Sequence, residues 1–289
     1  MDNVVPKAGK EILVRAFYRF TFLDFPRVQE LKDRLEEVAE QHSLGGSILL
    51  SSEGCNGTIA GLPSAIEAAF EVLREVYPDL RGQDSWDSRI PFGRWKVLLK
   101  DQIVAARDEE LSPNSNYDGQ LDPESWDKAC EMARRGEAQM IDVRNHYEVA
   151  IGTFPEAIDP GTATFKEFSD YLDREVGQSL DPEKPTAIFC TGGIRCEKAR
   201  MDLERRGFQN ILQLHGGILG YLKAKPKGGF QGECFVFDER VALDADLAPS
   251  RIYDRCPGCG DPWPRGESHN CRPKRTQATA VVSHKGGSR

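Results

Sequence analysis

From residue 125 to residue 224 the sequence alternates short apolar segments with longer amphipathic ones, and no other feature constrains the fold so strongly. Three apolar segments are shorter than a typical helix and fit buried strands: AQMIDVR (138–144), TAIFC (186–190) and NILQL (210–214). Segments with helical spacing lie around them: SWDKACEMARRG (125–136), TFKEFSDYL (164–172), IRCEKARMDLERRG (194–207) and GILGYLKA (217–224). This alternation predicts an α/β domain whose parallel sheet is covered by helices on both faces.

The first hundred residues follow another order, which predicts a separate α+β domain. Helices are predicted at 26–41 and 64–77 from apolar residues at helical spacing, as at Val28, Leu31 and Leu35. Strands are predicted at ILVRAFYRFTFL (12–23), SILLSS (47–52), NGTIAG (56–61) and WKVLLK (95–100). The turn SSEGCNGT contains three residues that can take positive φ: Gly54, Asn56 and Gly57. The resulting order βαββαβ is that of a ferredoxin-like, or acylphosphatase-like, domain.

A polar stretch separates these two patterns. DEELSPNSNYDGQLDPE (108–124) contains two prolines and has no apolar periodicity, so it predicts a linker. The remainder from about Lys225 is rich in glycine, proline and charge, which predicts little regular structure and a disordered end after about Arg275. We therefore expect a first domain at 1–107, the linker at 108–124, a second domain at 125–225 and a C-terminal extension at 226–289.

The composition predicts a cytoplasmic protein with reduced thiols. No stretch approaches the ~20 apolar residues of a membrane span, and MDNVVPKAGK at the start lacks the apolar run of a signal peptide. Eight cysteines are spread unevenly over the chain, which argues against a disulfide framework. The net charge of −8 gives no general footprint for nucleic acid. The segment from Arg251 onward has eight Lys and Arg against three acids, which suits either a solvated tail or an RNA contact.

The loop CTGGIR (190–195) follows a predicted strand and opens a predicted helix. Ligands of parallel sheets bind beyond the carboxyl ends of strands, which is where Cys190 lies. Gly192 and Gly193 permit backbone N–H groups to converge on the sulfur, and Arg195 adds a positive charge, so we expect a lowered pKa for Cys190. The rest of this predicted active-site loop is Thr191 and Ile194. The alternative is an ordinary buried cysteine before a glycine turn.

A second motif upstream favours the reactive interpretation. MIDVRNHYEVAIGTFPEAI (140–158) and the turn LHGGI (214–218) resemble the rhodanese signature, in which a strand ends in Asp-x-Arg and a glutamate follows. Asp142, Arg144 and Glu148 match that signature, and we expect them to support the loop rather than to react. Four residues lie between Cys190 and Arg195, which disfavours the larger loop of protein phosphatases.

The resemblance extends over roughly residues 11 to 260. EGCNGTIAG, PFGRWKVLLKDQIV, GQLDPESW, CTGGIRCEKA and GECFVFDERV together resemble the rhodanese-domain tRNA wobble-uridine hydroxylases. This resemblance implies oxygen-dependent hydroxylation of uridine 34 to 5-hydroxyuridine, with Cys190 essential, molecular oxygen as co-substrate and the tRNA anticodon region as partner. We find no flavin, nicotinamide or iron motif. How oxygen is activated does not follow from the sequence.

The C-terminal extension departs from the family, which often carries two C-x-x-C pairs. Here CPGCG contains Cys256 and Cys259, and a single cysteine, Cys271, follows in SHNCRPKR. Zinc accepts three cysteines and one histidine, so His269 is the candidate fourth ligand. The spacing of one residue between His269 and Cys271 is unusual for two ligands, and a metal-free remnant is the alternative.

Several roles stay open at this stage. Cys196 is either a redox partner of Cys190 or a small residue packed on the sheet. Four basic residues are candidate tRNA contacts: Arg94, Lys96, Lys198 and Arg200. The rings of FYRF (17–20) could stack a base, although Phe17 fits a core better. The competing functions are a sulfurtransferase or persulfide carrier, and a non-catalytic binding module that has no need for Cys190 and its glycine turn.

Overall fold

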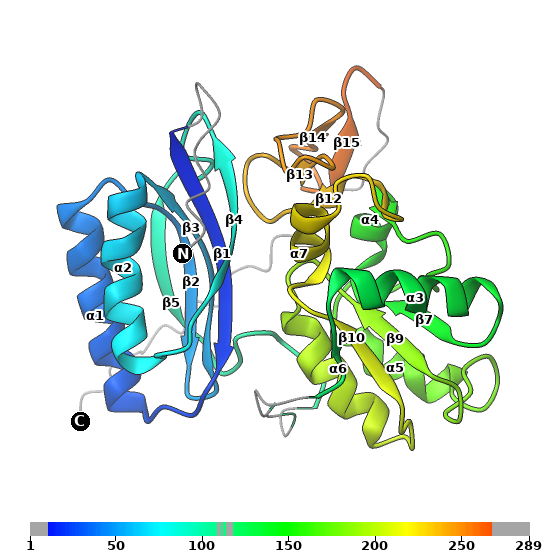
Figure 1. The fold of residues 1–289 in the computed structure, drawn as a ribbon. Helices are drawn as coiled ribbons and strands as arrows, with labels where there is room; N and C mark the ends of the chain where they lie inside the picture. Colours follow the sequence, from blue (N-terminus) through cyan, green and yellow to red (C-terminus); the bar gives the residue numbers. More distant parts are fainter. Residues whose placement is uncertain (1–10, 109–110, 112, 114–117, 268–289) are drawn as a thin grey trace, which may run out of the picture.

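A computed structural model describes residues 11–108, 111, 113 and 118–267 (Figure 1). Two α/β units lie side by side, and the segments that follow the second unit cover one end of it (Figure 1). The helices α1 and α2 lie on the outer face of the first sheet, so the other face of that sheet points toward the second unit (Figure 1). This arrangement confirms the predicted class, an α+β domain followed by an α/β domain.

The first unit is a sheet of five strands in the order β4-β1-β3-β2-β5. Its neighbouring strands pair antiparallel, except for the parallel pair β2 and β5. The elements are β1 (Ile12–Phe20), α1 (Phe25–Gln41), β2 (Gly45–Ser51), β3 (Gly54–Gly61), α2 (Pro63–Val76), β4 (Gly82–Asp87) and β5 (Trp95–Leu99). Asp24 caps α1 by accepting a hydrogen bond from the N–H of Arg27, and prolines in the first turn begin both helices.

The sequence did not predict β4. Its segment GQDSWD is polar, as an edge strand can be, because only one of its sides pairs with a neighbour. The hairpin turn also differs from the prediction. Of its three candidate residues only Gly54 takes a positive φ, of 145°, while Asn56 and Gly57 lie inside β3.

Successive side chains of β1 point to opposite faces of the first sheet, and the two faces pack against different parts of the protein. Leu13 and Phe17 pack in the core beneath α1 and α2. Val14 and Ala16 are offset from them by one residue and therefore point to the opposite face, together with Tyr18. That face lies toward the second unit, so β1 contributes side chains, Tyr18 among them, to the contact between the two units.

The second unit contains a parallel sheet in the order β6-β10-β9-β7. Its elements are β6 (Gln120–Leu121), α3 (Pro123–Arg134), β7 (Gln139–Asp142), α4 (His146–Val149), β8 (Gly152–Thr153), α5 (Glu167–Glu175), β9 (Thr186–Phe189), α6 (Ile194–Glu204), β10 (Ile211–Leu214) and α7 (Gly217–Ala224). The short strand β6 lies inside the stretch 108–124 that we expected to be a linker.

Both faces of this sheet are buried, as the sequence predicted. Along β9, Ala187 and Phe189 join a core with α3 and α7, whereas Ile188 joins a core with α5 and α6. Cys190 follows β9 directly and belongs to the second of these cores. Its side chain is therefore directed toward the start of α6.

Short two-stranded ladders form the rest of the described chain. They are built from β11 (Gln231–Gly232) with β8, β12 (Cys234–Phe235) with β13 (Ala242–Leu243), and β14 (Tyr253–Arg255) with β15 (Pro262–Pro264). No helix within the described ranges is long and apolar enough to cross a membrane. None of the cysteines in those ranges forms a disulfide. The predicted disordered end after Arg275 lies outside the described residues.

Candidate active site

The loop between β9 and α6 surrounds the sulfur of Cys190, which has no exposed surface. The N–H of Gly193 donates a hydrogen bond to Sγ over 3.1 Å. Gly193 has a φ of 104°, a conformation that residues with side chains rarely adopt, and it is the N-cap residue directly before α6. The glycine therefore allows the backbone to turn its N–H toward the sulfur.

The glycine turn before α7 is hydrogen-bonded to the backbone of this loop. The N–H groups of Ile218 and Leu219, at the start of α7, donate to the carbonyl oxygens of Cys190 and Thr191 over 2.9 and 3.0 Å. A Cβ on Gly217 would lie 2.5 Å from the carbonyl oxygen of Cys190, and Gly217 has a φ of 62°. Only glycine fits there, so the LHGGI turn is part of the loop's support.

The surroundings of Cys190 favour the thiolate. Burial raises the pKa of this thiol, but hydrogen bonds from the Cys196 thiol and the Gly193 N–H and the charge of Arg195 outweigh it, and the pKa is lowered to about 6. The thiol of Cys196 has the opposite shift, since burial and its hydrogen bond to Cys190 raise its pKa. At neutral pH the pair is therefore one thiolate and one thiol, with Cys196 as the donor.

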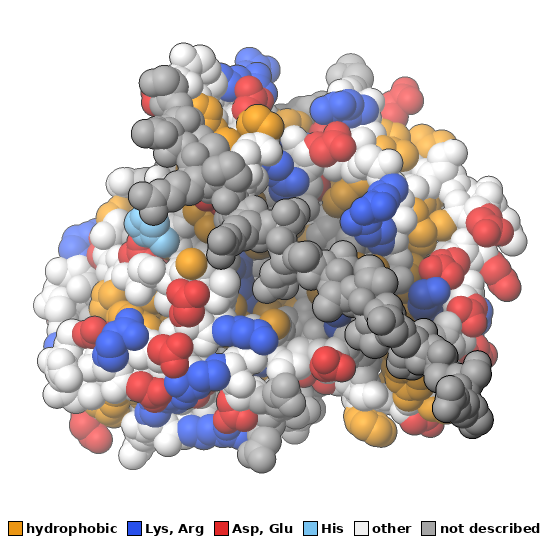
Figure 2. Space-filling model, turned by 180° about the vertical axis from the view of Figure 1, so that it is seen from behind, with side chains coloured by type: hydrophobic (Ala, Val, Ile, Leu, Met, Phe, Trp, Pro, Cys, Tyr) orange, Lys and Arg blue, Asp and Glu red, His pale blue; other side chains and the backbone are white. Residues whose placement is uncertain are grey.

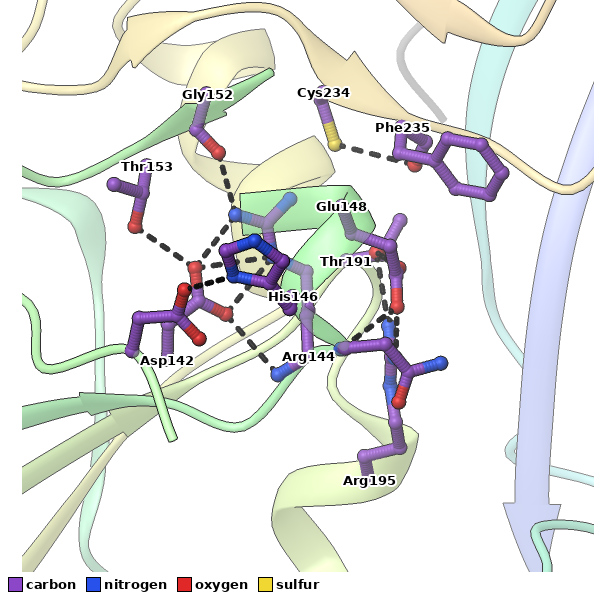
Figure 3. Close-up of polar contacts among 12 residues, drawn as sticks. Asp142, Arg144, His146, Glu148, Gly152, Thr153, Thr191, Arg195, Cys234 and Phe235 are labelled. Carbon is purple, nitrogen blue, oxygen red and sulfur yellow. Dashed lines mark hydrogen bonds and ion pairs between the residues drawn. The ribbon is translucent and has the colours of Figure 1, made fainter. Parts of the chain in front are cut away.

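Glu148 and Arg195 form the first support of the loop. Both carboxylate oxygens of Glu148 accept from the guanidinium, over 2.5 and 2.9 Å, and Glu148 is fully buried (Figure 3). Burial raises the pKa of Glu148, but the charge and hydrogen bonds of Arg195 and the charge of Arg144 lower it below its usual value. The ion pair fastens α4 to the first turn of α6, next to Thr191.

Asp142 and Arg144 form a second support, deeper in the unit. Their side chains are fully buried and are joined by three hydrogen bonds, the shortest from Nη2 to Oδ2 at 2.6 Å (Figure 3). Arg144 also donates to the carbonyl oxygen of Gly152, and Thr153 donates to Asp142. These contacts tie the end of β7 to β8.

Glu197 was missed by the sequence reasoning, which considered Tyr18 only as one of the rings of FYRF (17–20) that could stack a base. Tyr18 of the first sheet lies over the loop, where a Cβ on Gly193 would be 2.9 Å from its hydroxyl oxygen. That hydroxyl donates to Oε1 of Glu197, on α6, over 3.1 Å. The alternation of β1 could have placed Tyr18 on the outer face of its sheet, but no pattern in the sequence showed which part of the chain that face meets.

A small cavity of about 50 Å³ opens beside the loop where three parts of the chain meet. Ala16 and Thr58 line it from the first sheet, Thr191 from the loop, and Phe237 and Arg240 from the segment after α7. Phe237 is 58% exposed, and its ring centroid lies 5.9 Å from the guanidinium carbon of Arg195. The motif GECFVFDERV thus supplies an aromatic ring at the edge of the site.

Comparison with known proteins places this site in a family. Family models match a UPF0176 acylphosphatase like domain over residues 12–103, a rhodanese-like domain over 125–224 and a rhodanase C-terminal segment over 231–288. A protein of Bdellovibrio bacteriovorus named tRNA uridine(34) hydroxylase is 41% identical over 253 residues, which are 86% of this chain and 70% of that protein. The chain belongs to the tRNA uridine(34) hydroxylase family.

Two further members of the tRNA uridine(34) hydroxylase family have a similar sequence identity to this chain. The protein of that name from Picosynechococcus is 40% identical over 259 residues, 88% of this chain and 84% of the relative. The protein of that name from Acaryochloris marina is 40% identical over 256 residues, 87% of this chain and 80% of the relative. In all three cases the match covers both α/β units, so the resemblance that the sequence motifs indicated is confirmed.

A tRNA uridine(34) hydroxylase needs an RNA-binding surface, and the four candidate contacts fall into two pairs. Lys198 is fully buried and donates to Glu53 and Gln102, and Arg200 is 8% exposed and pairs with Glu204. Both side chains are therefore bound to other residues of the protein in this structure, whereas the sequence analysis expected them to be candidate tRNA contacts. Arg94 is exposed and Lys96 is half-buried on β5.

Lys96 shares a sheet face with the residues above the loop. It pairs with Ser47 of β2, which pairs with Thr58 of β3, which pairs with Ala16 of β1. Side chains in one such row point to the same face, so Lys96 leaves the sheet on the side of Tyr18. Acidic and basic side chains are interspersed on the face shown in Figure 2.

The family's C-terminal cysteines are described only in part. Cys256 and Cys259 lie close together at the turn between β14 and β15, and Cys256 hydrogen-bonds with Cys259. His269 and Cys271, the other two candidate ligands, lie outside the described residues. Within the described ranges no three His, Cys, Asp or Glu side chains gather as a metal site.

Proposed function

We propose that this chain hydroxylates uridine 34 of tRNA to 5-hydroxyuridine, with molecular oxygen as co-substrate and Cys190 as nucleophile. The observation that carries the proposal is a buried thiolate in a chain that is about 40% identical to proteins named tRNA uridine(34) hydroxylase. A thiolate that is ionised at neutral pH, because its pKa is about 6, suits nucleophilic attack.

The proposed reaction begins at C6 of uracil, which is electron-poor and therefore open to attack by a nucleophile. Cys190 adds to C6, and the electron pair of the C5=C6 bond makes C5 nucleophilic, so that C5 takes one atom of O₂ as a hydroxyl group. Two electrons from an external reductant convert the other oxygen atom to water. C5 then loses its proton as the C6–S bond breaks and its electron pair returns to the sulfur, which restores the ring. The N–H of Gly193 and the charge of Arg195 stabilise the thiolate whenever it leaves. Asp142, Arg144 and Glu148 keep the loop in this geometry.

A persulfide carrier or sulfurtransferase is the second candidate, since a sulfur cradle of this kind also suits a sulfane sulfur on Cys190. Complete burial of that sulfur beneath the sheet of the first unit disfavours rapid exchange with small donors such as thiosulfate. We expect negligible thiosulfate:cyanide turnover. Robust turnover, without any effect of the gene on 5-hydroxyuridine, would favour the sulfurtransferase.

The proposal is tested by the origin of the hydroxyl oxygen. We expect cells that depend on this chain for 5-hydroxyuridine to incorporate one ¹⁸O atom at position 34 when grown under ¹⁸O₂. Growth in H₂¹⁸O under ordinary oxygen should leave the nucleoside unlabelled. Mass spectrometry of the tRNA nucleosides gives the answer. Label from water alone, or no dependence of 5-hydroxyuridine on the chain, would contradict the proposal.

We also propose a small zinc site at the C-terminal end, formed by Cys256, Cys259, His269 and Cys271. Two thiols already brought together at a turn support it. Purified protein is expected to hold one zinc ion per chain by elemental analysis, and a Cys256→Ser, Cys259→Ser double variant none. Equal metal content in both proteins, or no zinc in the wild type, would exclude the site.

A further inference from the structure

Cys196 lies against the sulfur of Cys190, and the proposed function does not use its thiol. It is the third residue of α6, and its side chain has no exposed surface. Two groups of Cys196 hydrogen-bond to the sulfur of Cys190, namely its thiol and its backbone N–H. The two sulfur atoms are therefore in contact inside the second unit, within the core that they share with α5.

Packing alone does not require a thiol at this position. Ala199, three residues further along α6, contributes a small apolar side chain to the same core. A thiol differs from such a side chain in two ways. It donates a hydrogen bond to the nucleophile, and together with a second thiol in contact it can give up two electrons by forming a disulfide.

The proposed hydroxylation needs two electrons from outside the uracil ring. One atom of O₂ becomes the hydroxyl group on C5, and the other atom has to leave as water. Conversion of two thiols to one disulfide releases two electrons and two protons, which is the amount that this second oxygen atom takes up. The pair of Cys190 and Cys196 therefore matches the reaction in stoichiometry.

We propose that Cys196 passes these two electrons to oxygen: it reduces the peroxide that forms on C5 and then joins Cys190 in a disulfide, which an external thiol reductant reopens. The inference rests on the proposed function, since it assigns the electrons of that same reaction. Cys196 is a catalytic residue in this scheme, because its sulfur touches the reacting oxygen. Cys190 is first the nucleophile at C6 and then the partner in the disulfide.

Contact between the two sulfur atoms brings Cys196 within reach of the peroxide. When Cys190 is bonded to C6, the terminal oxygen of a peroxide on C5 is four bonds away from the sulfur of Cys190. An atom so close to that sulfur can also reach a group in contact with it. Both cysteines belong to the second unit, so the step does not depend on the contact between the two units.

The first half of the step transfers an oxygen atom to Cys196. Sγ of Cys190 bonds to C6, and the electron pair of the C5=C6 bond forms a bond from C5 to O₂, which leaves a peroxide anion. This anion takes the proton of the Cys196 thiol. The resulting thiolate bonds to the terminal oxygen, the O–O bond breaks, and its electron pair stays on the oxygen attached to C5. Cys196 is then a sulfenic acid.

The second half releases the product and forms the disulfide. C5 loses its proton as the C6–S bond breaks, the electron pair of that bond returns to Cys190, and the oxygen on C5 takes up a proton. The Cys190 thiolate bonds to the sulfur of the sulfenic acid, and hydroxide leaves and becomes water. In total, uridine, O₂ and two thiols become 5-hydroxyuridine, water and a disulfide. An external dithiol then reduces the disulfide by exchange.

The charges around the pair change in the direction that this order requires. In the resting protein the Cys190 thiolate raises the pKa of Cys196, together with burial and the charge of Glu197. Bonding of Cys190 to C6 removes that negative charge. The positive charge of Arg195, which lowers the pKa of Cys196, then favours a thiolate at Cys196 while the peroxide is present.

The test follows one turnover of the full-length protein without added reductant. Protein that has been reduced with dithiothreitol and freed of it is mixed in air with an excess of tRNA transcript that has uridine at position 34. Samples are quenched in acid, unfolded and alkylated. Nucleoside mass spectrometry counts 5-hydroxyuridine. Trypsin cuts after Arg195, so Cys190 and Cys196 lie on separate peptides that the disulfide joins.

We expect one 5-hydroxyuridine and one disulfide between Cys190 and Cys196 per chain, after which the reaction stops. Addition of dithiothreitol should restart it and give many turnovers. Without tRNA, or without oxygen, both cysteines should stay reduced over the same time, because the peroxide that oxidises Cys196 forms only on the bound uridine.

The Cys196→Ser variant tests the residue itself. Serine is close to cysteine in size and its hydroxyl can still donate to Cys190, but it forms no sulfenic acid and no disulfide. A thiol held at the site acts at an effective concentration far above that of dissolved dithiothreitol, so the variant should be at least about 100-fold slower even with this reductant. Cys130→Ser makes the same exchange at a buried cysteine of α3 and should keep the wild-type rate.

The stoichiometry of the wild type decides the inference even if Cys196→Ser does not fold. The role of Cys196 would be overturned by 5-hydroxyuridine without a matching disulfide, by a disulfide that forms as fast without tRNA, or by a wild-type rate in folded Cys196→Ser. Each of these results leaves the proposed function standing. A wild type that makes no 5-hydroxyuridine with or without dithiothreitol would overturn both proposals.

Discussion

Replacement of Cys190 by alanine is expected to abolish 5-hydroxyuridine at position 34. The reason is that the thiolate is the only group at the loop that can form and later break a bond to C6, and alanine offers no lone pair. Nucleoside mass spectrometry of tRNA should give the same value for cells with Cys190→Ala as for cells without the gene. Restoration of 5-hydroxyuridine by the alanine variant would remove Cys190 from the mechanism.

Cys130 provides the matched control. It is a buried cysteine of α3, 6% exposed, and burial, with the charges of Glu156 and Asp127, raises its pKa to about 12. It therefore stays a thiol at neutral pH and does not act as a nucleophile. Cys130→Ala should retain 5-hydroxyuridine. Equal losses in both variants would show that removing any buried sulfur damages the protein.

Replacement of Glu148 by alanine is expected to destabilise the protein more than substitution of a surface carboxylate such as Glu137. Both partners of the Glu148–Arg195 pair are buried, so the variant leaves the Arg195 guanidinium buried without its anion. Breaking a buried pair in this way costs about 3–5 kcal/mol of unfolding free energy. Denaturant unfolding measures the loss. The product 5-hydroxyuridine should also disappear, because Arg195 no longer holds its place beside Cys190.

Two further variants separate stability from catalysis at this pair. Glu148→Gln keeps the volume and one acceptor, so it should fold and still make far less 5-hydroxyuridine than the wild type. Glu137 pairs with Arg135 at the surface, and Glu137→Ala should leave the unfolding midpoint where it is. Wild-type activity in a folded Glu148→Gln protein would show that the pair contributes only to stability.

Most of the fold could be predicted from the sequence because the spacing of apolar residues indicates where its strands and helices lie. The strands β7 and β9 are buried on both faces and the helices α3 and α5 on one face, so the pattern of apolar residues shows the environment of each element. The misses are elements without that signal. GQDSWD of β4 is a polar edge strand, and β6 is two residues of a stretch that looks like a linker.

The residues of the candidate site also fall into those that the sequence could predict and those that it could not. Cys190 and Glu148 lie in local motifs whose spacing fixes their position, so sequence alone brought them together. Tyr18 and Glu197 meet from positions far apart in the chain, and that meeting depends on how two units dock. Lys198 was misjudged because lysine is rarely buried, and only its contact with Glu53 across the interface shows why it is here.

The burial of Cys190 also affects how readily its thiolate is oxidised. Thiolates with a low pKa are the ones that peroxide converts to sulfenic and then irreversibly to sulfinic acid. Here the sheet that carries Tyr18 covers the loop, and the sulfur has no surface open to solvent. The protein in this structure thus shelters its most oxidisable atom from solvent.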